Sequence, residues 1–235
     1  MIAGGRRRND PAQYDELVDE WWRPSGEFAA LHWIAASRAE HIPPAARPDA
    51  VLVDLACGGG LMAPHVGRLG YRHVGVDIGL RGLELAREHG VTPVRGSVLA
   101  VPLADGCADV VVAGEILEHV ADDVGVLAEC ARLLRPGGTL VLDALAAGRL
   151  SVLINVHLLE RLPGGPPPGL HDPALFVDRG RLLAAADRLG LDLRLVGLRP
   201  SLRDAIAWKL GRRTTVQMKP IRSTAVVFAG YGRKR

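Results

Sequence analysis

The clearest fold signal in this chain of 235 residues is Val51-Leu52-Val53-Asp54-Leu55-Ala56-Cys57-Gly58-Gly59-Gly60. Its apolar start predicts a buried strand, and its glycines let the backbone turn tightly and approach a ligand. A second apolar run, Val74-Gly75-Val76-Asp77, follows and ends in an acid. A carboxylate there can accept hydrogen bonds from both hydroxyls of a ribose. The two runs predict a nucleoside-binding βαβ unit, with its ligand at the carboxyl ends of parallel strands.

The residues next to the glycines bear on which nucleoside binds. Gly58-Gly59-Gly60-Leu61-Met62-Ala63 fits the dinucleotide fingerprint G-x-G-x-x-G/A, and Asp77 lies near the distance expected for its ribose acid. A nicotinamide-dependent oxidoreductase is therefore one interpretation. Asp54, however, precedes the glycines, where it would repel a pyrophosphate and attract a cationic amino-acid ligand. The sequence favours the second kind of ligand.

A third strand and a turn extend the pattern. Residues 108–115 predict a strand that ends in Glu115, residues 121–134 a helix, and Pro136-Gly137-Gly138 a turn into a strand over 139–145. This arrangement resembles the class I S-adenosylmethionine-dependent methyltransferases. The resemblance implies an α/β fold with a doubly wound, Rossmann-like sheet and S-adenosylmethionine as cofactor.

Further motifs narrow the resemblance. They occur in the same order as in the ubiquinone-biosynthesis O-methyltransferase family, over about residues 14 to 200: Trp21-Trp22, Gly26-Glu27-Phe28, Leu31-His32, Arg38, Glu115-Ile116-Leu117-Glu118-His119-Val120 and Leu170-His171-Asp172-Pro173. Members of that family methylate ring hydroxyls of polyprenylated phenols and catechols. The resemblance implies an O-methyltransferase with a small phenolic acceptor.

The expected cofactor-binding residues follow from the motifs. Asp77 is expected to bind the ribose hydroxyls of S-adenosylmethionine, and Asp54 is expected to bind its ammonium group. The resemblance assigns Arg38 to the carboxylate of the same cofactor. Ala56 stands where the family usually has glycine, and we expect it to be tolerated provided that its φ is negative. The full set is Arg38, Asp54, Ala56, Gly58, Gly60, Asp77, Ile78 and Gly114.

Glu115, Glu118 and His119 form a second candidate group, for catalysis. If a helix begins near Glu115, these positions share one face and their side chains converge. Two carboxylates and an imidazole suit Mg²⁺, or a general base with its orienting partners, and the resemblance favours the metal. Either would raise the phenolate fraction of an acceptor whose pKa is near 10. A helix-start acid beside a core-facing histidine is the structural alternative.

The rest of the chain is organised around this domain. Residues 1–13 are predicted to be a mobile tail and 14–235 a single methyltransferase domain, with a helical cap over 14–48 and a lid over 150–172. Apolar residues within 150–170 suit peripheral membrane contact, as the resemblance implies, or a buried crossover helix equally well. Downstream, the pattern predicts a helix over 179–189 and strands over 191–198 and 223–229, around a polar, basic 199–220.

Bulk properties limit the remaining functions. The net charge of +3, without a basic-aromatic surface or an Asn-Pro-Pro-Tyr-like motif after the strand over 108–115, argues against nucleic-acid binding. Basic groups at both ends, Arg6-Arg7-Arg8 and Arg233-Lys234-Arg235, are read as solvated tails or as attracted to an anionic membrane. Three widely spaced cysteines predict a cytoplasmic protein without disulfides.

The acceptor itself stays open at this level. Asp143-Ala144-Leu145-Ala146-Ala147-Gly148 replaces the polar stretch usual in the family, and the lid is rich in proline. An aromatic secondary metabolite is therefore an alternative to a polyprenyl-quinone precursor. A catalytically silent methyltransferase-like protein is the remaining alternative, and the oligomeric state is not determined.

Overall fold

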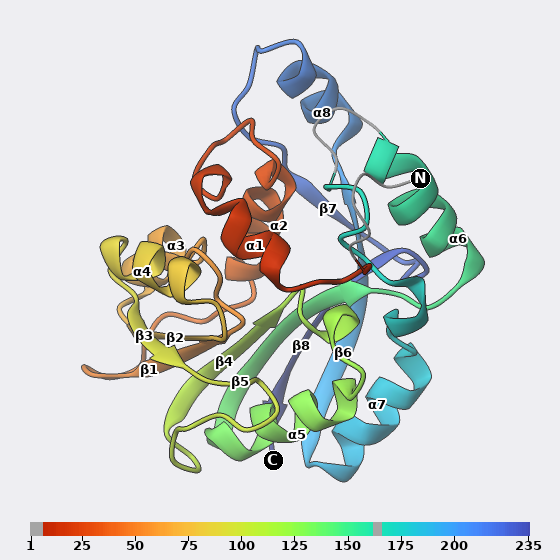
Figure 1. The fold of residues 1–235 in the computed structure, drawn as a ribbon. Helices are drawn as coiled ribbons and strands as arrows, with labels where there is room; N and C mark the ends of the chain where they lie inside the picture. The colour runs from red at the N-terminus through yellow and green to blue at the C-terminus, as the bar shows by residue number, and fades with distance from the viewer. Residues whose placement is uncertain (1–6, 162–165) are drawn as a thin grey trace.

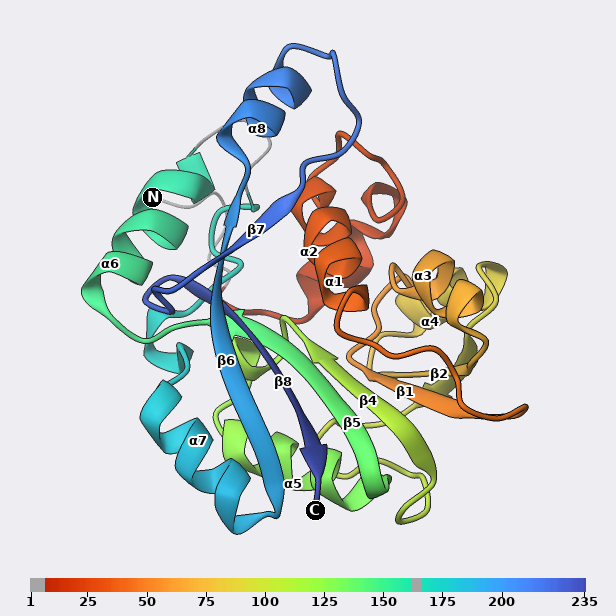
Figure 2. The ribbon, with the colours of Figure 1, turned by 180° about the vertical axis from the view of Figure 1, so that it is seen from behind.

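The structure is a computed structural model that describes residues 7–161 and 166–235. Within these residues the strands form an eight-stranded sheet in the order β3-β2-β1-β4-β5-β8-β6-β7 (Figure 1). The strands from β3 to β5 are parallel, and β8 is antiparallel to both of its neighbours, between which it lies (Figure 2). The strands are β1 (Val51–Leu55), β2 (Arg72–Asp77), β3 (Thr92–Arg95), β4 (Ala108–Gly114), β5 (Leu134–Leu145), β6 (Leu191–Pro200), β7 (Met218–Ile221) and β8 (Val227–Lys234).

Helices cover both faces of the sheet and one of its ends. Figures 1 and 2 show α5 and α7 along the sheet, whereas α1, α2, α6 and α8 gather beyond one end of the central strands. The α-helices are α1 (Ala12–Glu16), α2 (Ala29–Ala39), α3 (Ala63–Leu69), α4 (Leu80–Glu88), α5 (Asp123–Leu133), α6 (Arg149–Val152), α7 (Arg179–Arg188) and α8 (Leu202–Lys209). Short 3₁₀ turns span Val18–Glu20, Leu117–His119, Leu159–Arg161 and Pro173–Leu175, and a π-helical turn spans Leu153–Leu158.

Side-chain alternation along the central strands divides the core into two layers. Leu52 and Val110 pack on one side of the sheet, in the cluster that holds Phe28 of the cap. Val53 and Val111, their neighbours in sequence, belong to the cluster on the other side, which includes residues of α5 and α7. Consecutive strand residues point to opposite faces, so a continuous apolar run is buried on both sides. The layers hold β1 and β4 in place, and with them the loops that follow.

The structure confirms most of the predicted elements. The helix over 121–134 and the strand over 139–145, for example, are present as α5 and the second half of β5. The fold class is the predicted one, with an N-terminal helical cap and a segment inserted after β5. None of the helices formed by the described residues is long and apolar enough to cross a membrane.

The structure differs from the sequence-based expectations at both ends of the chain and adds elements that the sequence did not predict. Of the predicted mobile tail, residues 1–6 lie outside the described part, but Arg8 and Asn9 are tied to other segments and α1 begins at Ala12. Arg233 and Lys234 belong to β8, which is longer than predicted because it pairs along both β5 and β6. The polar region 199–220 contains α8 and the start of β7, neither of which its composition indicated.

Candidate active site

The loop after β1 is built by backbone conformations that few side chains permit. Gly58 and Gly60 have positive φ, at 49° and 79°, and a Cβ on Gly58 would overlap the ring of Trp21. Ala56 also has a positive φ, 55°, so the condition that we set for alanine here is not met. A left-handed alanine is strained by roughly 1–2 kcal/mol relative to a right-handed one. The turn after β1 therefore holds Ala56 in a left-handed backbone conformation that alanine disfavours.

The tryptophan pair of the cap clamps the same loop. Trp21 is buried and its ring lies against Gly58, whereas Trp22 donates from Nε1 to the carbonyl oxygen of Gly59 at 2.9 Å. Trp22 also stacks on His89, with ring centroids 3.7 Å apart. Both indoles thus contact the glycines, and the cap and the loop form one unit.

Asp77 secures the loop from the tip of β2. Its two carboxylate oxygens accept from the backbone N–H groups of Gly58 and Gly79, each at 2.8 Å. Burial raises the pKa of Asp77, while the amide donors oppose that rise. A carboxylate has about four acceptor positions, so the two amides leave room for a ribose. The residue predicted to hold the sugar also fixes the glycine loop.

Asp54 lies inside the fold near the end of β1. Its carboxylate is buried, with Oδ2 3.3 Å from Nε2 of His73, and it lines the same cavity as Asp77. That cavity, of about 810 Å³, is lined by every predicted cofactor residue except Gly60. Gly60 instead packs against Ala86 of α4, so its role is to admit the helix rather than to touch a ligand.

Arg38 is held by an acid that sequence reasoning missed. Its Nε donates to Oδ2 of Asp143 at 2.6 Å and its Nη2 donates to Oδ1 at 2.7 Å. Both side chains are buried, and the guanidinium covers Gly114, where a Cβ would overlap it. Burial by itself lowers the pKa of Arg38, but the charge and hydrogen bonds of Asp143, with other nearby acids, outweigh it and raise that pKa, so the guanidinium stays charged. The signal for Asp143 was available, because it is the one charged residue within the apolar run from Leu140 to Leu145.

The predicted group of Glu115, Glu118 and His119 does not converge. Glu115 follows the last residue of β4 and has φ 50°. Leu117–His119 then forms a 3₁₀ turn rather than an α-helix. Glu115 and His119 line the cavity, but Glu118 lies in the core, where Oε1 accepts from the backbone N–H of Leu145 at 3.3 Å. The part of the chain that the structure describes brings no three His, Cys, Asp or Glu side chains together as a metal site.

Burial sets the charge state of the acids near this turn. It raises the pKa of Glu118 to about 8, and it raises that of Glu115 well above its usual range, with the neighbouring Glu118 adding to the shift. Oε1 of Glu115 is buried without a hydrogen-bond partner. Protonated carboxylic acids suit these positions better than a pair of cation-binding carboxylates does.

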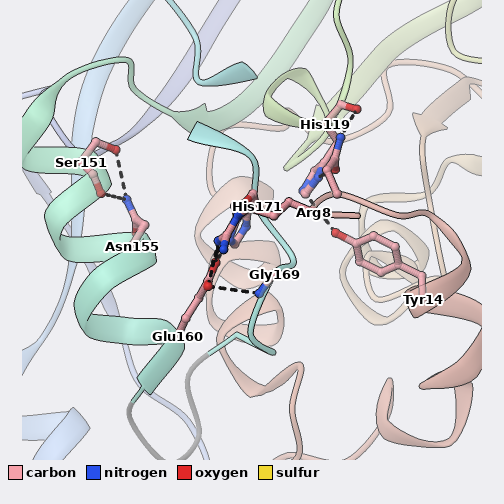
Figure 3. A network of polar contacts seen from close by, with 9 residues as sticks. Arg8, Tyr14, His119, Ser151, Asn155, Glu160, Gly169 and His171 are labelled. Carbon is pink, nitrogen blue, oxygen red and sulfur yellow. Dashed lines mark hydrogen bonds and ion pairs between the residues drawn. The ribbon is translucent and has the colours of Figure 1, made fainter. Parts of the chain in front are cut away.

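His119 lines the same cavity and contacts two other polar side chains there. Its Nδ1 lies 2.5 Å from Oδ1 of Asn9, and its Nε2 lies 3.2 Å from the hydroxyl of Tyr14, toward which it points (Figure 3). Burial lowers the pKa of His119 to about 3 and that of His171, which stacks on it, to about 4. The imidazole is therefore neutral at physiological pH. Asn9 and Tyr14 escaped prediction, because Asn9 lies in the supposed tail and Tyr14 at its border.

The segment after β5 closes the cavity. Asn155, Leu159, Leu170 and His171, all within the predicted lid, are among its lining residues, as are Phe28 and Leu31 of the cap. Most of the lining surface is apolar, and its polar groups include the acids at the ends of β1 and β2, Asp54 and Asp77, and the imidazole of His119. An apolar ligand with one polar end fits this distribution.

Comparisons with known proteins agree with the fold and identify the family. Residues 53–142 match the family model described as a methyltransferase domain. The chain is 31% identical over 223 residues to the ubiquinone biosynthesis O-methyltransferase of Vibrio parahaemolyticus, covering 88% of this chain and 93% of that protein. The protein of the same name from Thiobacillus denitrificans is 32% identical, covering 77% and 82%.

Solved structures share the fold at lower identity. A methyltransferase of Thermotoga maritima, described as a possible histamine N-methyltransferase, superposes with a TM-score of 0.67 at 19% identity and covers 94% of this chain and 98% of its own. At that identity the match establishes the architecture and leaves the acceptor open.

Proposed function

This chain belongs to the class I S-adenosylmethionine-dependent methyltransferases, in which its relatives are named ubiquinone biosynthesis O-methyltransferases, and we propose that it methylates a phenolic or catechol hydroxyl. The cofactor, when bound, supplies an electrophilic methyl group on a sulfonium. Asp77 would hold its ribose, Asp54 its ammonium and Arg38 its carboxylate. The donor set fits such a zwitterion, because Asp54 and Asp77 line the same cavity as the Arg38 guanidinium.

The observation that carries the acceptor class is the contact between His119 and Tyr14. A phenol hydroxyl already lies 3.2 Å from Nε2 of a neutral imidazole, at the wall of a largely apolar cavity. An acceptor phenol that takes the place of this hydroxyl would present its proton to the same lone pair. Alignment of the acceptor and removal of one proton are what the transfer requires of the protein.

Charge balance supports His119 as the general base. A buried imidazolium is costly, which is why burial lowers the pKa of His119 to about 3. During the reaction His119 would gain a positive charge as the sulfonium loses one, so the net charge of the buried site stays constant. Proton transfer to Nε2 is therefore expected to accompany methyl transfer rather than to precede it.

The donors predicted for a divalent cation do not fit one in this structure. Glu118 lies outside the cavity and is bonded to the backbone of Leu145, and the raised pKa of Glu115 favours its neutral form. Of the predicted trio, only His119 is placed for a direct role in the proposed reaction. Glu115 borders the site, and Glu118 supports the turn from within the core.

The names of the relatives and the exposed leucines bear on two further points, the identity of the acceptor and contact with a membrane. The names of the relatives support a polyprenyl-quinone precursor as acceptor, and an aromatic secondary metabolite would fit the apolar lining equally well. Leu150, Leu153 and Leu158 are about half exposed on the segment after β5, which supports peripheral contact with a membrane from the cytoplasmic side. A catalytically silent relative remains the alternative to be tested.

The deciding experiment is an acceptor screen. The protein is incubated with S-adenosylmethionine and catechols, hydroquinones or prenylated phenols, with and without EDTA, and products are read by the mass of one added methyl group. We expect methylation that survives EDTA and is lost in His119→Asn. Titration with S-adenosylhomocysteine and with NAD(P) forms the control. Binding of S-adenosylhomocysteine without turnover of any acceptor would favour the silent protein.

A further inference from the structure

The residues before α1 form a strap across the site. Arg8 donates from Nη2 to both carboxylate oxygens of Glu160, at 2.6 and 2.8 Å, and from Nε to the carbonyl oxygen of His171 at 2.6 Å (Figure 3). The backbone N–H of Asn9 donates to the carbonyl oxygen of Gly169 at 2.9 Å. These contacts fix the strap, here Arg8 and Asn9, against the segment that closes the cavity, and so place the Asn9 side chain beside His119.

The side-chain amide of Asn9 contacts both the backbone carbonyl group and the imidazole ring of His119. Its Nδ2 donates to the backbone carbonyl oxygen of His119 at 2.9 Å, and its Oδ1 lies 2.5 Å from Nδ1 of the same residue. A carbonyl oxygen only accepts, so the amide nitrogen must face it. The amide oxygen is then left facing Nδ1, and two acceptors at that distance would repel each other unless Nδ1 carries the proton.

Only one tautomer of a neutral His119 satisfies this bridge. The reversed amide would set Oδ1 against the carbonyl oxygen, and a bare Nδ1 would set two lone pairs together. We propose that Asn9 is a positioning residue that holds His119 with its proton on Nδ1 and its lone pair on Nε2, facing Tyr14 and the acceptor. The catalytic part of this inference rests on the proposed function of His119, whereas the tautomer does not.

In this tautomer, Nε2 of His119 carries a free lone pair before the acceptor binds, so it can act as the general base. With Nδ1 protonated, the Tyr14 hydroxyl donates to Nε2, and an acceptor hydroxyl can replace it there. On transfer, the acceptor O–H bond would break and its electron pair would form the new oxygen–methyl bond. The bond between the methyl group and the sulfonium would break with its electron pair left on sulfur, and the proton would go to Nε2. The resulting imidazolium still donates from Nδ1 to Asn9, so the orienting bond persists through the step.

The tautomer is read directly by NMR. Protein labelled with ¹⁵N in histidine gives long-range ¹H–¹⁵N spectra in which protonated and bare ring nitrogens have separate shifts, and His119→Asn assigns the signal. We expect a protonated Nδ1 in the unchanged protein and a shift toward protonated Nε2 in Asn9→Gly, which removes the amide at a residue whose φ of 59° suits glycine. A protonated Nε2 in the unchanged protein would overturn the proposal.

Kinetics separate orientation from structure. Asn9→Gly is expected to lower kcat by about tenfold or more and to leave the affinity for S-adenosylhomocysteine unchanged. Gln217→Gly, which removes an exposed amide elsewhere, is the matched control and should leave the rate unaltered. An unchanged kcat in Asn9→Gly would contradict an orienting role.

The two hypotheses fail separately. If His119→Asn retains full turnover while the Nδ1 proton depends on Asn9, the base assignment is wrong and the tautomer assignment stands. If His119→Asn abolishes turnover while Asn9→Gly changes neither the tautomer nor kcat, the proposed function stands and the role of Asn9 is wrong.

Discussion

Arg38 of α2 and Asp143 of β5 form a buried two-point ion pair, although 105 positions separate them in the chain. The pair joins the N-terminal cap to the centre of the sheet and sets the guanidinium over Gly114, at the wall of the cavity. A planar fork of this kind fixes the direction of an arginine as well as its charge. The position of Arg38, the residue that we propose holds the cofactor carboxylate, therefore depends on a tertiary contact.

Breaking this pair should cost both stability and binding. Asp143→Ala leaves the Arg38 charge buried and unpaired, and we expect the free energy of unfolding to fall by about 3–5 kcal/mol. The double variant Arg38→Met/Asp143→Leu fills the site with apolar groups and should recover much of that loss without recovering affinity for S-adenosylhomocysteine. Chemical denaturation and calorimetric titration measure the two quantities. Normal binding by the double variant would show that Arg38 does not hold the ligand.

Asp77→Asn should weaken cofactor binding. An amide there keeps one acceptor oxygen but places an NH₂ group against a backbone N–H that now donates to the carboxylate. Loss of hydrogen bonds to a charged group predicts an affinity for S-adenosylhomocysteine lower by roughly 10- to 100-fold. Asp105→Asn, at an exposed acid, is the control for lost charge. Equal affinities for Asp77→Asn and the unchanged protein would refute this assignment.

Ala56→Gly should stabilise the protein. The residue sits at φ 55°, where glycine has no Cβ penalty, and the relief exceeds the extra chain entropy of glycine when unfolded. We expect a gain of about 0.5–1 kcal/mol, seen as a rise in Tm of roughly 1–4 °C. Scanning calorimetry of both proteins measures it. A fall in Tm would mean that the strain at this turn has been overestimated.

Tyr14→Phe should make the acceptor easier to bind. The acceptor hydroxyl and the Tyr14 hydroxyl compete for Nε2 of His119, and phenylalanine keeps the packing on Phe28 and Trp21 without the hydroxyl. We expect KM for a phenolic acceptor to fall by about 2- to 10-fold with kcat preserved. Steady-state kinetics test this, and a large loss of kcat would instead give Tyr14 a part in the chemistry.

Stability should depend on pH in opposite directions on the two sides of neutrality. Below pH 6.5 the unfolded chain protonates His119 and His171, whose folded pKa values are about 3 and 4, so stability falls as pH falls through that window. Glu118 has a folded pKa of about 8, so the folded protein retains a proton that the unfolded chain loses above pH 4.5. Stability therefore falls as pH rises toward 8.

Glu118→Gln isolates the alkaline part of this dependence. The variant cannot titrate, so the decline between pH 6.5 and 8 should be shallower, by at most about 1.4 kcal/mol per pH unit. Denaturation midpoints measured across pH 4 to 9 provide the comparison. An unchanged alkaline slope would indicate that the buried acid titrates normally.

The sequence alone determined the central sheet, the glycine loop after β1 and the place of Asp77 at the tip of β2. These features follow from local patterns: apolar runs long enough to be buried strands, glycines where the backbone must turn, and an acid at a strand end. It also correctly set Arg38, Asp54 and His119 at one cavity, because parallel strands and the cap meet at the same edge.

Only the tertiary structure decided the partners of those residues. Asn9 and His119 are 110 positions apart and Arg38 and Asp143 are 105 apart, and no local pattern records such a pairing. The positive φ of Glu115 likewise redirected Glu118 into the core and dispersed the expected metal group. A spacing of three or four residues places side chains on one face only if those residues form an α-helix. The left-handed conformation of Glu115 prevents a helix from beginning there, so the side chains point in different directions.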